Sequence, residues 1–85
     1  PNPRHMEIRS LRAFVTVAEE LHFGRAARRL AISQPTLTQQ IQHLEKSVEK
    51  PLFLRSNRMV LLSEHGRRLL DHARALVTKA DSFLQ

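Results

Sequence analysis

The chain has 85 residues, of which 41% are hydrophobic, so it is long enough for one small domain that a partner would help to stabilise. Fourteen lysines and arginines face eight acids, and the resulting net charge of +6 favours a polyanionic partner. The lack of cysteine excludes disulfides and thiolate metal sites, the lack of Trp and Tyr argues against stacking on single-stranded bases, and no apolar run approaches the ~20 residues of a membrane span.

The chain begins with residues Pro1–His5, which are typical of an expression-tag remnant, and Met6 is the expected native start. From Ile8 to Leu21 the apolar residues recur at helical spacing, which predicts a first helix. The segment Gly24–Ala31 then predicts a short second helix, in which two alanines allow another helix to approach closely and three arginines line the remainder.

A third helix is predicted from Ser33, a good N-cap, to about Val48, with Pro35 in its first turn. Four apolar residues spaced by four, three and four positions form one narrow stripe along it: Leu37, Ile41, Leu44 and Val48. Its opposite face carries no acid and no large apolar residue. That face is rich in Gln and Thr, which both donate and accept hydrogen bonds.

Two short apolar runs follow Pro51 and flank the polar turn 55–58, which predicts a small hairpin, the wing, over residues 52–62. Ser63 then caps a last helix over residues 64–85. This helix of about 22 residues spans about 33 Å, more than the first three helices could cover. Part of a heptad-like seam along it should therefore be open to a second copy: Leu69, Leu70, Ala73, Leu76, Val77, Ala80, Phe83 and Leu84.

No catalytic site, metal site or cofactor site is visible in the sequence. The five histidines form no HExxH or HxxxH pair, and only two glycines are present, so there is no glycine-rich phosphate loop. The serines do not form a nucleophile elbow. We therefore expect that the protein is not an enzyme and that it carries no cofactor or metal.

The two central helices, joined by a tight turn, have the physical signature of a helix-turn-helix, whose second helix enters the major groove of DNA. The alternative on pattern alone is an amphipathic helical hairpin with a solvated polar face. The charge distribution favours DNA, because no Asp or Glu occurs over residues 21–44 or over residues 50–63. Non-specific nucleic-acid binding and a helical protein-interaction module remain as rival functions.

These residues resemble the N-terminal domain of LysR-type transcriptional regulators from Met6 to about Leu70. The resemblance is carried by a string of matched positions with family spacing: Phe23-Gly24-Arg25-Ala26-Ala27, Leu30, Ile32-Ser33-Gln34-Pro35-Thr36-Leu37-Thr38, Ile41, Leu44-Glu45, Leu52-Phe53, Arg55, Arg58, Leu62-Ser63, Gly66 and Leu69-Leu70. It implies a mainly α fold, a winged helix-turn-helix of three helices and a two-stranded wing over residues 6–63, followed by a long linker and dimerisation helix. The helix-turn-helix proper would cover residues 23–42.

The resemblance also implies site residues. Base reading maps onto the start of the third helix, to which the helical face adds two further positions: Gln34, Pro35, Thr36, Thr38 and Gln39, with Gln42 and His43 added. Contacts to the DNA backbone map onto the start of the second helix, the third helix cap and the wing: Gly24, Arg25, Ser33, Arg55, Asn57 and Arg58.

As a whole, the resemblance implies sequence-specific binding of double-stranded promoter or operator DNA by a homodimer on a pseudo-palindrome. It implies a cytoplasmic bacterial protein, associated with the nucleoid when bound. It further implies a missing C-terminal domain that binds a small-molecule inducer, in a parent protein that is often tetrameric. One departure concerns Glu49, where the family usually has glycine: either the third helix ends differently or it accepts strain of order ~1 kcal/mol.

Overall fold

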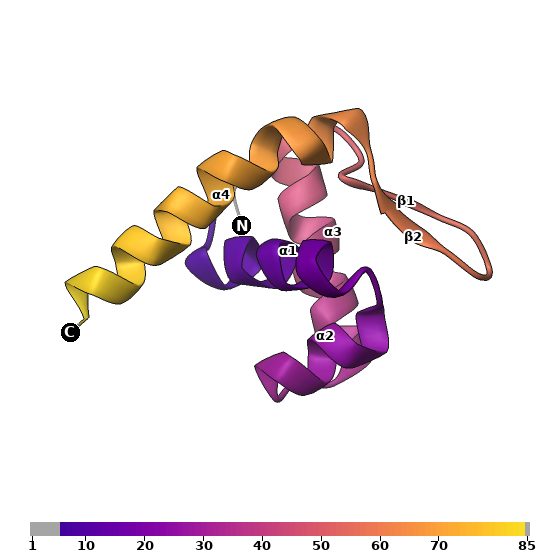
Figure 1. Ribbon diagram of the computed structural model, residues 1–85, viewed down its shortest axis with the longest axis horizontal. Coiled ribbons are helices and arrows are strands. Elements are labelled where there is room, and N and C mark those ends of the chain that lie inside the picture. Colours follow the sequence, from indigo (N-terminus) through magenta and orange to yellow (C-terminus); the bar gives the residue numbers. More distant parts are fainter. Residues whose placement is uncertain (1–5, 85) are drawn as a thin grey trace.

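The computed structural model describes residues 6–84, so the predicted tag remnant Pro1–His5 and the last residue, Gln85, lie outside the described residues. Within residues 6–84, helices and one antiparallel hairpin build the mainly α winged helix-turn-helix that the sequence predicts (Figure 1). The elements are α1 Ile8–Glu20, α2 Phe23–Leu30, α3 Gln34–Val48, β1 Phe53–Arg55, β2 Val60–Leu62 and α4 Glu64–Phe83.

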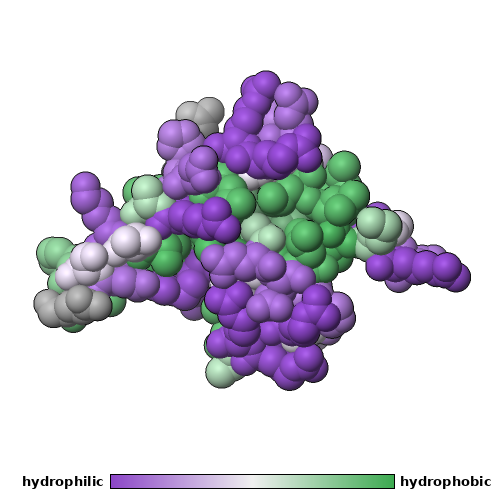
Figure 2. Space-filling model, viewed as in Figure 1, coloured by the Kyte–Doolittle hydropathy of each residue, from purple (hydrophilic) through white to green (hydrophobic). Residues whose placement is uncertain are grey.

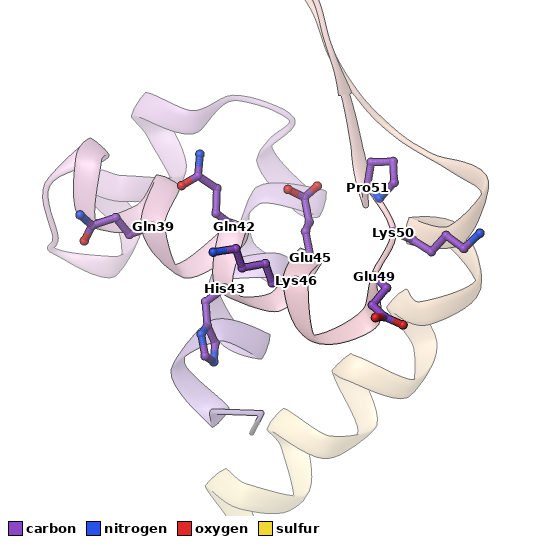
Figure 3. Close-up of a pocket in the computed structure, with 8 residues that line it drawn as sticks. All are labelled: Gln39, Gln42, His43, Glu45, Lys46, Glu49, Lys50 and Pro51. Carbon is purple, nitrogen blue, oxygen red and sulfur yellow. The ribbon is translucent and has the colours of Figure 1, made fainter. Parts of the chain in front are cut away.

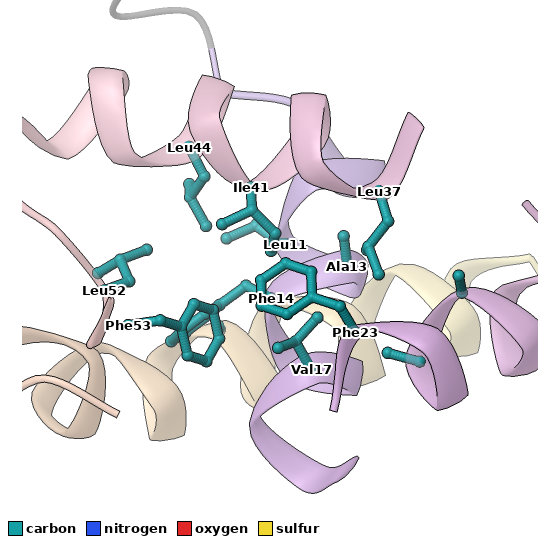
Figure 4. Close-up of a cluster of buried hydrophobic side chains, with 13 residues drawn as sticks. Leu11, Ala13, Phe14, Val17, Phe23, Leu37, Ile41, Leu44, Leu52 and Phe53 are labelled. Atoms are coloured by element: carbon teal, nitrogen blue, oxygen red, sulfur yellow. The ribbon is translucent and has the colours of Figure 1, made fainter. Parts of the chain in front are cut away.

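Helix α1 forms the centre of the fold, because α2, α3 and α4 all pack against it. The apolar stripe predicted for α3 is confirmed, since Leu37, Ile41 and Leu44 are fully buried. The stripe predicted for α1 is only partly right: its two ends, Ile8 and Leu21, are exposed. Its core residues come from a wider arc because helices cover α1 on several sides. Figure 4 shows the resulting cluster: Leu11, Ala13, Phe14, Val17, Phe23, Ala26, Ala27, Leu37, Ile41, Leu44, Leu52, Phe53 and Ala73.

The wing is an antiparallel hairpin in which Phe53 pairs with Leu62 and Arg55 pairs with Val60. Phe53 anchors its base to the helices. Its ring centroid lies 5.5 Å from that of Phe14 and 6.1 Å from that of Phe23, both in edge-on geometry, which aromatic rings prefer over stacking face to face. The base of the wing is thereby fixed to α1 and α2, while its tip projects away from the helices (Figure 1).

Helices α3 and α4 begin directly after the two serines that the sequence predicts as N-caps. The Ser33 hydroxyl accepts a hydrogen bond from the backbone N–H of Thr36 at 3.2 Å, and the Ser63 hydroxyl accepts one from Gly66 at 3.0 Å. Gly66 also allows α4 to approach β1, because a Cβ at this position would lie 2.2 Å from the carbonyl oxygen of Leu52. A larger residue here would push α4 away from the wing.

The first three helices all end on a non-glycine residue in the left-handed conformation: Leu21 (φ 49°), Ala31 (φ 55°) and Glu49 (φ 59°). At Glu49 the backbone N–H donates to the carbonyls of Glu45 and Lys46. Of the two possibilities left open for Glu49, the structure shows the second: α3 ends on a left-handed residue, and Glu49 accepts the strain.

Helix α4 packs on α1, and its last turns extend beyond the other helices (Figure 1). Near its end, the Asp81 carboxylate accepts two hydrogen bonds from the Arg12 guanidinium, at 2.8 and 3.2 Å. This contact, between residues 69 positions apart, ties the far part of α4 to α1. Within residues 6–84, no helix is both long enough and apolar enough to cross a membrane.

Candidate nucleic-acid interface

The exposed face of α3 carries the predicted base-reading residues together. All seven lie on α3, where five are exposed and two, Thr38 and His43, are half-buried. The opposite, buried stripe fixes the rotation of the helix against α1, so the polar face is directed to solvent. The five exposed base-reading residues are Gln34, Pro35, Thr36, Gln39 and Gln42. This arrangement presents amide and hydroxyl groups that both donate and accept hydrogen bonds.

The first turn of α3 is fixed by its own hydroxyl groups. The Ser33 hydroxyl donates to Thr36 Oγ1 at 2.8 Å and also accepts from the Thr36 backbone N–H. Ser33 is therefore engaged within the chain as an N-cap, whereas the Thr36 hydroxyl still has its own hydrogen to donate. Both residues are exposed at the start of α3.

The start of α2 is held by His22, a cap that was not predicted from the sequence. Its Nδ1 accepts a hydrogen bond from the backbone N–H of Arg25 at 2.9 Å. Gly24 packs against this ring, because a Cβ there would lie 2.9 Å from His22 Cε1. Histidine is not among the preferred N-cap residues, so the only signal in the sequence was its position just before the helical pattern.

The side chain of Arg25, a predicted phosphate ligand, is directed toward α1. Its Nε donates to Glu20 Oε1 at 3.2 Å and its Nη2 donates to the Glu20 carbonyl at 3.0 Å. Arg29 joins the same cluster through Glu19 at 3.0 Å and Glu20 at 3.1 Å. Hydrogen bonds from Arg29, which have the larger effect, and from Arg25 hold the pKa of the Glu20 carboxyl below its usual value. Glu20 is therefore ionised at neutral pH.

The wing places three predicted DNA ligands beside the helix-turn-helix. The Arg55 guanidinium lies 4.5 Å from the centroid of the Phe23 ring, a cation–π contact that orients it. At the tip, the Ser56 hydroxyl accepts hydrogen bonds from the backbone N–H groups of Arg58 and Met59. This turn leaves the side chains of Asn57 and Arg58 exposed.

A groove of about 390 Å³ joins these parts, between the wing and the starts of α2 and α3. Most of the predicted backbone ligands and two predicted base readers line it: Gly24, Arg55, Asn57 and Arg58 with Gln34 and Thr38. The fold thus brings the predicted site into one surface, although its members are up to 34 positions apart in the sequence. Ser33 and Arg25 do not line this groove.

A second, more open groove of about 810 Å³ runs along the later part of α3 (Figure 3). It is lined by three predicted base readers, Gln39, Gln42 and His43, and by two lysines, Lys46 and Lys50. The two acids in it lie toward the end of α3, and the carboxylate of Glu45 accepts a hydrogen bond from the Leu52 backbone at 2.8 Å. Neither lysine was predicted from the sequence as a DNA ligand, although Lys46 lines the same groove as Gln39 and Gln42.

The predicted dimerisation seam on α4 divides into two parts. Ala73 is 1% exposed and belongs to the core of the chain itself, so it is not available to a second copy. Leu69, Leu70 and Val77 are partly buried against the same core. Toward the C-terminal end, Leu76, Phe83 and Leu84 are 48%, 88% and 79% exposed. Only this last part of the seam is open.

The described residues contain no group of three or more His, Asp and Glu side chains that could hold a metal ion.

The surface is polar over the tip of the wing, as Figure 2 shows, whereas apolar side chains gather where the wing, the end of α1 and the beginning of α4 meet. A hydrogen-bonding helix face beside a wing that carries two arginines defines the class of protein: a winged helix-turn-helix DNA-binding domain.

The comparisons with known proteins identify the family. The model for the bacterial regulatory helix-turn-helix protein, lysR family, matches residues 8–67, so the chain belongs to the LysR family. It is 53% identical over 77 residues to the uncharacterized HTH-type transcriptional regulator YnfL of Escherichia coli. The aligned region covers 91% of this chain and 26% of YnfL. It is 51% identical over 78 residues to the HTH-type transcriptional regulator IlvR of Caulobacter vibrioides, with 92% and 26% covered.

Solved structures agree with this assignment. A hydrogen-peroxide-bound OxyR C206S mutant of Corynebacterium glutamicum matches with a TM-score of 0.92 and 42% identity, over 94% of this chain and 25% of the OxyR chain. The BenM DNA-binding domain in complex with catB site 1 DNA matches with a TM-score of 0.86 and 39% identity, over 93% of this chain and 89% of that one. The chain therefore spans about a quarter of YnfL, IlvR and OxyR, but nearly all of the BenM domain.

Proposed function

We propose that this domain binds double-stranded operator DNA in a sequence-specific manner, with α3 in the major groove and the wing on the sugar-phosphate backbone or minor groove. The observation that carries the proposal is the exposed, acid-free face of α3, joined by a groove to the arginines of the wing. Support comes from the BenM domain, which has the same fold and is bound to DNA. The major groove admits an α-helix and presents a distinct pattern for each base pair.

The base-reading role belongs to the exposed side of α3, because its side chains reach out from a helix that is fixed by a buried stripe. Gln is suited to bidentate contact with adenine, and Thr can contact either hydrogen-bonding groups or the thymine methyl. The assigned residues are Gln34, Pro35, Thr36, Thr38, Gln39, Gln42 and His43.

The backbone-binding role belongs to the start of α2, the cap of α3 and the wing. Arg55 and Arg58 supply positive charge at the groove, and Asn57 is exposed beside them at the wing tip. Contacts of this kind set the orientation of the protein on the duplex and do not read sequence. The assigned residues are Gly24, Arg25, Ser33, Arg55, Asn57 and Arg58.

The domain would act as a homodimer through the exposed part of α4. Large apolar side chains such as Leu76 and Phe83 are costly in water and gain from burial against a second copy. A two-fold dimer places its recognition helices one helical turn of DNA apart, about 34 Å, or a multiple of that, which matches a pseudo-palindromic operator.

The parent protein would be a cytoplasmic bacterial transcriptional regulator without enzymatic activity. Its relatives are named as transcriptional regulators, and this chain covers only 26% of YnfL and of IlvR. The remaining part would bind a small-molecule inducer and assemble the dimers into a tetramer. Association with the nucleoid would follow from binding to DNA.

A fluorescence-anisotropy titration tests the proposal. An operator duplex is first selected from random sequences, and then compared with a scrambled duplex of equal length at two salt concentrations. We expect the selected duplex to bind at least roughly a thousandfold more tightly, with affinity falling as salt rises. Equal affinity for both duplexes would indicate a non-specific nucleic-acid binder, and no salt-dependent binding would indicate a protein-interaction module.

A further inference from the structure

The carboxylate of Glu20 holds two of the three arginines of α2. It accepts a hydrogen bond from Arg25 at 3.2 Å through one oxygen and from Arg29 at 3.1 Å through the other. The Glu20 carbonyl accepts a further bond from Arg25 at 3.0 Å. The Arg25 side chain is 52% exposed and that of Arg29 is 48% exposed. Both guanidinium groups therefore lie at the surface but are turned toward α1.

Glu20 has an unfavourable position within its own helix. It is the last residue of α1, next to Glu19, and this turn contains no basic residue. The helix dipole places partial negative charge at this end and disfavours an acid there. The stability of α1 in isolation therefore gives no reason for Glu20, and its favourable contacts are those with the arginines of α2.

Glu20 also lies beside the proposed DNA surface. The residue before Arg25 is Gly24, and a Cβ on Gly24 would be 3.7 Å from Gln34 Oε1, at the start of α3. Arg25 itself shares a shallow hollow of about 380 Å³ with Glu20, Arg28 and Arg29. Glu20 thus brings a negative charge to the edge of a region, residues 21–44, that has none of its own.

We propose that Glu20 attenuates the affinity of this domain for DNA by competing with a backbone phosphate for the guanidinium of Arg25. This inference rests on the proposed DNA-binding function. Ion pairs exposed to water are weak, so a phosphate can displace the carboxylate when the duplex binds. Because phosphate contacts carry no sequence information, Glu20 lowers the affinity for operator and for random DNA alike.

The test compares the wild-type protein with Glu20→Gln and with a matched control, Glu19→Gln. The control removes the same charge one residue away, but Glu19 contacts Arg29 and Arg74 rather than Arg25. Because Arg25 reaches the phosphate in both proteins, the number of phosphate contacts and the salt slope should stay the same, and only the cost of breaking the exposed pair with Glu20 is removed. We expect Glu20→Gln to bind both duplexes about 1.5- to fivefold more tightly at low salt, because Arg25 no longer has to leave a carboxylate.

The role of Arg25 is tested by the double variant Glu20→Gln/Arg25→Gln, which should lose the gain. A persistent gain in the double variant, or an equal gain in Glu19→Gln, would reduce the effect to net charge and overturn the proposal. Weaker binding by Glu20→Gln would make Glu20 a residue that positions α2 for DNA. Absence of DNA binding in the wild-type protein would overturn the proposed function as well, so the two failures are distinguishable.

A second measurement does not depend on how well the variants fold. In the wild-type protein, the NMR resonance of the Arg25 Nε–H group reports its bond to Glu20. Addition of an operator duplex should move this resonance, because the guanidinium exchanges a carboxylate for a phosphate. A resonance that stays unchanged at saturation would show that Arg25 keeps its bond to Glu20 on DNA and would overturn the proposal.

Discussion

Glu49 closes α3 in a left-handed conformation that L-residues adopt only at a cost. Its φ of 59° and ψ of 31° place it there, and its backbone N–H satisfies two carbonyls of the last turn of α3. The side chain itself is exposed. The backbone is therefore strained at the junction between the recognition helix α3 and the wing.

Replacing Glu49 by glycine should relieve this strain. We expect Glu49→Gly to raise the free energy of unfolding by about 1 kcal/mol, because glycine has no Cβ to clash in the left-handed region. Thermal denaturation followed by circular dichroism measures the change. Glu49→Ala is the matched control: it removes the charge but keeps the Cβ. A similar gain in both variants would show that charge and not backbone strain is responsible.

The Arg12–Asp81 pair predicts a pH dependence of stability. The hydrogen bonds from Arg12 hold the pKa of the Asp81 carboxyl below its ordinary value. Such a group stabilises the folded state above its unfolded pKa, about 4 for Asp, and loses this contribution as pH falls through the folded pKa. Asp81→Asn should therefore melt at a lower temperature than the wild-type protein near neutral pH. The difference should shrink in acid, and a constant difference would contradict the account.

At the scale of elements, local signals in the sequence predicted much of the fold. Ser33 and Ser63 are N-caps in the structure, and the spacing of Leu37, Ile41 and Leu44 predicted which side of α3 is buried. The wing was predicted over residues 52–62, and its strands lie within that range. These features succeed because capping and periodicity depend on residues a few positions apart.

Features that depend on distant contacts were not predictable in this way. Arg25 was predicted to bind phosphate, but its bonds to Glu20 depend on how α2 folds back on α1. Ala73 was predicted to lie in an interface between copies, whereas the packing of α4 on α1 buries that residue within the chain. The cap at His22 was missed because histidine rarely fills that role.

The two proposed modes of contact at α3 and the wing predict different effects of substitution. Gln34→Ala should cost about 1–3 kcal/mol on the operator and relax the preference at one base pair. Arg58→Ala should weaken binding to all sequences and flatten the salt slope by about one unit. Anisotropy titrations with operator and random duplexes separate these effects. Equal losses on both duplexes for Gln34→Ala would rule out its base-reading role.

At the scale of the whole molecule, α4 is the element that the chain does not fully use. Ala73 completes the core from the middle of α4, while Leu76 on the next turn and Phe83 on the C-terminal extension of the helix are exposed. The ion pair between Arg12 and Asp81 holds this extension in place. An exposed apolar stripe on a fixed helix is suited to pairing with a copy of itself.

Charge at this stripe should prevent self-association. We expect Leu76→Asp to shift the sedimentation equilibrium toward the monomer and to lower the affinity for a two-half-site operator. Leu61→Asp is a matched control, since Leu61 is 45% exposed against 48% for Leu76 but lies on the wing. Equal effects on association in the two variants would locate the interface elsewhere or show that the exchange disturbs the fold.

The central claim is that α3 and the wing receive DNA, and an NMR titration of the labelled protein with the selected operator duplex tests it most directly. We expect the largest chemical-shift changes along the exposed face from Gln34 to His43 and at the wing tip around Arg58, larger than any changes on the exposed side of α4 around Leu76, where a second copy would pack. Changes concentrated on that side of α4, with the α3 face unaffected, would contradict the account.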